Sequence, residues 1–76
     1  MHKEQIMLSE LEMAKNAGKN IKVTLLDGQI IIGFCRGFTQ AIDNEPEIAE
    51  IDIELENGHL TGAFQDEIES IEVVEG

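Results

Sequence analysis

The sequence lacks several residue types, and each absence restricts what the protein can be. It contains one cysteine, one proline, no tryptophan and no tyrosine. One cysteine excludes a disulfide within the chain, and a lone thiol is typical of a reducing compartment. Cys35 follows the apolar residues 30–32 and Phe34. We therefore interpret it as a small packed hydrophobic residue, because a catalytic thiol needs an electropositive, partly exposed setting.

Long hydrophobic runs are also missing. No segment approaches the ~18–20 apolar residues that span a bilayer. The first sixteen residues contain charged side chains and no continuous apolar stretch, so we do not expect them to be a secretory signal. We expect a cytoplasmic protein without a membrane segment.

Basic residues are scarce. The chain has 5 Lys and Arg against 16 Asp and Glu, a formal net charge of −11. Proteins bind nucleic acid largely by neutralising phosphates with Lys and Arg, so nucleic acid is not the expected partner, and an anionic membrane would repel the chain for the same reason. Two interpretations of the acidity stay open: it keeps a small protein soluble, or it forms a surface for a basic protein partner.

Candidates for chemistry are few. The oxygen-rich segment from Asp43 to Glu47 lacks the length and central glycine of an EF-hand loop, and we regard weak cation binding there as incidental. His2, Cys35 and His59 offer no zinc framework. No glycine-rich phosphate loop occurs. We therefore expect no metal site, no cofactor and no enzymatic activity.

The chain is short enough for one domain, residues 1–76, and two patterns divide it. Residues 1–17 have apolar residues at helical spacing, Met7, Leu11 and Ala14, followed by Gly18 as a stop signal. The pattern predicts an amphipathic helix whose stripe of Met7, Leu11 and Ala14 contacts the rest of the domain or a second copy. The oligomeric state stays open.

From residue 18 the period changes to two, which predicts five strands near 20–26, 29–38, 48–56, 59–64 and 68–74. Asp27-Gly28 and Asn57-Gly58 predict hairpins with type I′ turns. The second strand is apolar on both faces. We expect residues 30, 32, 34 and 38 on one face and residues 31, 33 and 35 on the other, with bends at its glycines. We expect such a strand either to curl between two sheets or to be covered on both sides.

The third strand has the clearest alternation. Its apolar residues Ala49, Ile51, Ile53 and Leu55 alternate with four acids, which the period-two pattern places on one outer face: Glu50, Asp52, Glu54 and Glu56. These four are the candidate partner-binding residues. The alternative is a charged face that only meets solvent, because four similar solvated carboxylates do not form an acid–base pair.

A helix followed by five short strands with tight turns predicts a mainly β protein with one N-terminal helix, folded as a small barrel over residues 18–76. This order resembles the Sm-like fold, a five-stranded SH3-like barrel. The closest stretch runs from Val23 to Gln29 and continues to Gly33 and Phe38, and it is similar to the first Sm motif.

The resemblance implies an RNA pocket in a ring-shaped assembly, and the residues expected for that pocket differ here. Thr39 follows the aromatic residue where the family has an aspartate, and Asp43 falls near the uridine-contacting asparagine. Thr61 precedes Gly62 where the family has a cation. The chain is also similar to small acidic Sm-like proteins that inhibit the transcription terminator Rho by covering its RNA-binding surface.

From these observations we expect a non-enzymatic binding or regulatory protein whose acidic surface contacts a basic protein partner. The alternative is a subunit of an Sm-like RNA-binding ring.

Overall fold

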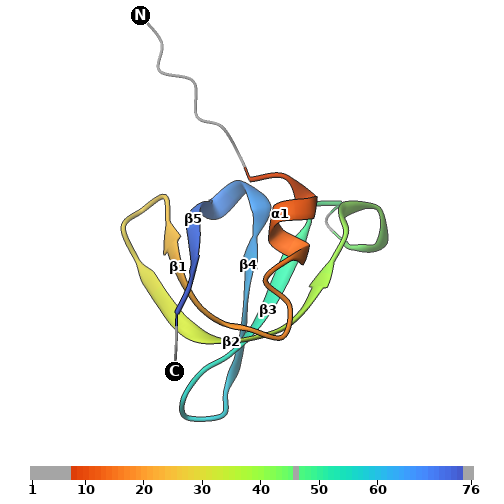
Figure 1. Cartoon of the computed structure of the whole chain (residues 1–76). Coiled ribbons are helices and arrows are strands. Elements are labelled where there is room, and N and C mark those ends of the chain that lie inside the picture. Colours follow the sequence, from red (N-terminus) through yellow and green to blue (C-terminus); the bar gives the residue numbers. More distant parts are fainter. Residues whose placement is uncertain (1–7, 46, 75–76) are drawn as a thin grey trace, which may run out of the picture.

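The computed structural model describes residues 8–45 and 47–74. In this part of the chain one short helix precedes five strands, and two single-turn 3-10 helices join them (Figure 1). In chain order the elements are α1 (Glu10–Ala14), β1 (Asn20–Leu25), β2 (Ile30–Thr39), η1 (Ala41–Asp43), β3 (Glu50–Glu54), β4 (Leu60–Phe64), η2 (Gln65–Glu67) and β5 (Ile68–Val73). The five strands agree with the sequence prediction to within two residues at each end.

The strands form one antiparallel sheet in the order β4-β3-β2-β1-β5. Among the described residues β4 and β5 are the two edges, so the sheet is open and the closed barrel predicted from the sequence is not shown. In the sequence η2 connects these two edge strands. It leads into β5, which pairs with the edge of β1 that β2 leaves free. The mainly β fold with a preceding helix is confirmed.

A bulge bends β2, the central strand of the sheet. Its register against β3 shifts between Cys35 and Gly37, which leaves Arg36 as the extra residue. Such an extra residue bends a strand and re-aims the side chains beyond it. Phe38 therefore pairs with Ile51 and packs against the core. The prediction that Phe38 shares a face with residues 30, 32 and 34 is wrong for this reason.

Both hairpins form where the sequence predicts them, but with another turn type. Gly28 and Gly58 have φ angles of +95° and +87°, and no described residue other than glycine has a positive φ. A type I′ turn needs two positive φ angles, so that prediction is wrong. The amide of Leu25 bonds to Gln29 O, and that of Leu55 bonds to His59 O, which closes loops of three residues with glycine last. This is the three-residue hairpin in which glycine takes the left-handed position.

The core lies on the inner face of the curved sheet. Its fully or nearly fully buried members come from α1, from the segment before β3 and from all five strands: Met13, Ile21, Val23, Cys35, Ala49, Ile51, Ile53, Ala63 and Ile68. The alternation in β1 and β3 predicted from the sequence places Ile21, Val23, Ile51 and Ile53 correctly. The strands thus bury one row of side chains and leave the other row outside.

The helix is shorter than predicted, and another residue anchors it. The Ser9 side chain accepts a hydrogen bond from Glu12 N at 3.1 Å, so Ser9 is the N-cap and the helix begins at Glu10. Near the other end, Asn16 Nδ2 donates to Glu12 O at 2.8 Å. Met13 is fully buried, whereas Leu11 is 69% exposed.

Leu11 therefore does not pack on the sheet of its own chain, and its contact with a second copy, the other alternative from the sequence, stays a prediction. A helix of five residues has one side toward the core, and Met13 occupies that side. Ala14 is half-buried, and Met7 lies outside the described residues. Two side-chain bonds hold the start of the helix in place: Gln65 Nε2 donates to Leu8 O at 2.6 Å, and Ala41 N donates to Glu10 Oε1 at 3.2 Å.

Candidate functional site

The predicted acidic residues lie on the outer face of the sheet, opposite the core. Glu50, Asp52 and Glu54 are half-exposed, while Ile51 and Ile53 between them are fully buried. The strand ends at Glu54. Glu56 therefore does not continue the row on the strand; it lies exposed in the β3–β4 hairpin loop. The acidic row consists of three strand residues and one loop residue.

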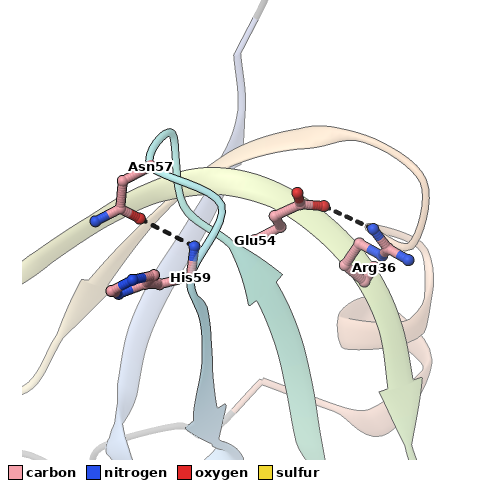
Figure 2. Close-up of polar contacts among 4 residues, drawn as sticks. All are labelled: Arg36, Glu54, Asn57 and His59. Carbon is pink, nitrogen blue, oxygen red and sulfur yellow. Dashed lines mark hydrogen bonds and ion pairs between the residues drawn. The ribbon is translucent and has the colours of Figure 1, made fainter.

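Arg36 partly neutralises Glu54, the last acid of this row on β3. Its Nη1 atom lies 2.6 Å from Glu54 Oε1 (Figure 2). Arg36 is the extra residue of the β2 bulge. The two side chains are 57% and 35% exposed, and exposed pairs of this kind contribute about 0–1 kcal/mol. The pair therefore orients Glu54 more than it stabilises the fold.

Glu50, the first acid of this row on β3, is oriented by the loop that precedes the strand. Asn44 Nδ2 donates to Glu50 Oε1 at 3.2 Å and to Ile48 O at 2.9 Å. The carboxylate of Glu50 lies over Gly62 on β4, where a Cβ atom would collide with it. Glycine at position 62 therefore leaves room for this orientation of the Glu50 carboxylate.

Asp52 lies between two residues without side chains. Its cross-strand neighbours are Gly37 on β2 and Gly62 on β4. Side chains directly opposite each other normally cover one another on a sheet face, and here that cover is missing. Glu50 and Glu54 lie on either side of Asp52 on the same face, at about 6.6–7 Å along the strand, so like charges are close together. A cationic side chain can approach Asp52 over Gly37, where the space is open, whereas the carboxylate of Glu50 fills the space over Gly62.

An apolar stripe lies beside the acidic row. Ile30, Ile32 and Phe34 point outward from β2 and are 54%, 61% and 39% exposed. Phe34 pairs with Glu54, and Glu54 pairs with Leu60, which is 68% exposed. The sequence pattern indicated that both faces of this strand are covered. Within the described residues, the outer face of β2 is exposed. We call Ile30, Ile32 and Phe34 the β2 stripe.

A groove runs beside the β2 stripe. It has a volume of about 600 Å³, opens widely to solvent and is lined by Ile32, Leu55, Glu56 and Asn57. The β3–β4 hairpin forms its other wall and projects beyond β2 (Figure 1). Asn57 Oδ1 accepts a hydrogen bond from His59 N at 3.0 Å, which fixes the hairpin (Figure 2). Sequence reasoning missed this groove, because Ile32 lies on β2 and the other lining residues lie in the β3–β4 loop, far from it in the sequence.

The thiol of Cys35 is fully buried in the core. Burial raises the pKa of this thiol above its ordinary value of about 9.0, and the charge of Asp52 adds to the effect. A backbone hydrogen bond at Gly37 acts in the opposite direction and lowers the pKa. A protonated, buried thiol is a poor nucleophile, in agreement with a packing role for Cys35.

The Cys35 pKa predicts how stability changes in alkali. Because the thiol pKa is raised in the folded state, the unfolded chain loses this proton first as the pH increases. The stabilising contribution is complete below about pH 9.0 and is lost as the pH rises through the folded-state pKa. We expect the free energy of unfolding to fall more steeply above that pH in the wild type than in Cys35→Ala. Urea denaturation at pH 7 to 10.5 tests this; parallel curves would contradict it.

Within residues 8–45 and 47–74, no group of three or more His, Cys, Asp or Glu side chains could hold a metal ion. Asp43 belongs to η1, and its Oδ2 atom accepts from Gln40 Nε2 at 3.0 Å. No helix among these residues is long and apolar enough to span a membrane.

Comparison with known proteins assigns no family. A scan against protein-family models, a search of the curated proteins and a search of the solved structures found no match.

Proposed function

We propose that this protein is a non-enzymatic binding or regulatory protein that contacts a basic protein surface through the outer face of its sheet. The observation that supports this most is the position of Asp52. It lies between Gly37 and Gly62, with Glu50 and Glu54 on either side along the strand. Like charges held on one rigid strand repel one another, and a partner's Lys or Arg side chains would relieve that repulsion.

The overall charge supports the same proposal. A net charge of −11 speeds the approach of a basic partner and repels anionic ones. Electrostatic complementarity of this kind acts mainly on association rate and specificity. The resemblance to acidic Sm-like inhibitors of Rho implies the same mode of action, in which an acidic surface covers a basic one.

The experiment compares two variants of equal charge change. Asp52→Lys/Glu54→Lys alters the acidic row, and Asp66→Lys/Glu69→Lys alters two exposed acids on η2 and β5. Each protein is immobilised and exposed to cytosol, and retained proteins are identified by mass spectrometry. We expect a basic protein that the wild type and the Asp66/Glu69 variant retain and the Asp52/Glu54 variant loses. Equal retention by all three would contradict the proposal.

The second candidate is a subunit of an Sm-like RNA-binding ring. The observation in its favour is the order of elements, a helix followed by five antiparallel strands in one sheet. Against it, position 61 is a half-buried threonine and position 43 is an acid. We expect no binding of oligouridine at physiological salt, measured by fluorescence anisotropy with the mass of the protein determined alongside. Tight binding by a ring-sized assembly would favour the second candidate instead.

A further inference from the structure

The β2 stripe differs from the outward rows on both neighbouring strands. On β1 the outward residues are Asn20, Lys22 and Thr24, and on β3 they are Glu50, Asp52 and Glu54. The three outward positions of β2 that pair with β1 are all large and apolar: Ile30, Ile32 and Phe34. Strands with apolar residues on both faces are typical of sheets covered on both sides. Within the described residues only the inner face of β2 is covered.

The charges around the stripe define what can cover it. On the β3 side lie Glu54, which pairs with Phe34 across the strands and forms the ion pair with Arg36, and Glu56, which lines the groove with Ile32. On the β1 side Lys22 pairs with Ile32, and Glu72 lies opposite Lys22 on β5. The groove thus combines the apolar side chains of Ile32 and Leu55 with the carboxylate of Glu56. A second copy of this chain would bring another −11 charges against this acidic region.

We infer that the β2 stripe and its groove bind a cationic amphipathic segment of a partner protein. Apolar side chains of the segment pack on Ile30, Ile32 and Phe34, and its Lys or Arg side chains meet Glu54 and Glu56. The inference rests on the proposed function and deepens it, because it adds an apolar anchor to the acidic face. Apolar anchors at the centre of an interface typically provide most of the binding energy, and charges at the rim provide rate and specificity.

The test uses three synthetic peptides of equal length and two matched variants. The first peptide alternates leucine with lysine, the second alternates serine with lysine, and the third alternates leucine with glutamate. Ile32→Gln removes the centre of the stripe, and Ile42→Gln changes an isoleucine on η1 that is 76% exposed and lies outside the groove. Amide chemical shifts report both folding and the site of binding.

We expect the leucine–lysine peptide to shift the amides around Ile32 and Leu55 in the wild type. Ile32→Gln weakens this binding about tenfold, the loss expected for one packed apolar anchor, and Ile42→Gln leaves it unchanged. If Ile32→Gln fails to fold, Ile30→Gln replaces it, since Ile30 is 54% exposed. Equal affinities for the leucine–lysine and serine–lysine peptides, with no effect of Ile32→Gln, would overturn the inference and leave the proposed function intact.

The remaining outcomes also decide between the proposals. Failure of both lysine peptides to bind would overturn this inference, whereas the proposed function is decided separately by the retention of a basic protein in the charge-variant experiment. Equal binding of the leucine–glutamate peptide at the stripe would show an apolar site without preference for cations, and would overturn the inference. A dimer found by sedimentation that Ile32→Gln disperses and Ile42→Gln does not would assign the stripe to a second copy, and would also overturn it.

Discussion

Gly33→Ala is expected to destabilise the fold strongly, although it adds a single methyl group. A Cβ atom at this position would lie 2.5 Å from the backbone oxygen of Glu54 and 2.7 Å from Ile53 Cγ2. Neither contact can be relieved by rotating a flexible side chain end, because one involves backbone and the other a fully buried residue. The neighbouring strands β2 and β3 must therefore move apart at this point. Overpacking of this kind costs about 1–3 kcal/mol.

Gly37→Ala is the matched control, because it makes the same change four residues further along the same strand. A Cβ atom there would meet nothing within 4 Å. Urea denaturation followed by far-ultraviolet circular dichroism gives the free energy of unfolding of both variants. We expect a loss for Gly33→Ala and a change within about 0.5 kcal/mol for Gly37→Ala. Equal stability of the two variants would contradict the close approach of Glu54 and Ile53 to Gly33.

Met13→Ala is expected to lose about 2–5 kcal/mol, the usual range for truncating a fully buried methionine. Met13 is the one residue of α1 that is fully buried. A domain of this size has a net stability of only ~3–5 kcal/mol, so the variant will be close to unfolded.

Leu11→Ala is the control for this second experiment, since Leu11 lies on the same helix and is 69% exposed. We expect a change of at most about 0.5 kcal/mol. The sequence pattern favours the opposite result, because the spacing of Met7, Leu11 and Ala14 marks Leu11 as the contact residue. A large loss for Leu11→Ala with an unchanged mass would support the sequence pattern against the structure.

The strands could be predicted because alternation and turn residues act locally. Ile21 and Val23 alternate with polar residues, and Asn57-Gly58 supplies a turn with a positive φ at glycine, so neither depends on distant contacts. The helix could not be predicted in this way, because its length is set by the Ser9 cap and its inward side by contacts of Met13 with the core. Helices of this length depend on tertiary contacts rather than on propensity.

The candidate site was predicted in part for a similar reason. Alternation alone places Glu50, Asp52 and Glu54 on one face. The register between strands adds what the sequence does not show, namely that Gly37 and Gly62 lie on both sides of Asp52. The ion pair of Arg36 with Glu54 depends on the bulge, which the glycines of β2 indicated without fixing its place. The turn types and the side of the sheet on which Phe38 lies also depend on how the strands pair, which the sequence alone does not show.

The most direct test of the proposed function is the association rate of the retained basic partner at two ionic strengths. At low salt we expect rapid association with the wild type, which slows as salt is added because screening shortens the range of charge attraction. Asp52→Lys/Glu54→Lys should associate slowly at both ionic strengths, and Asp66→Lys/Glu69→Lys should follow the wild type. An association rate that is the same in all three proteins and independent of salt would contradict the claim that the acidic row contacts the partner.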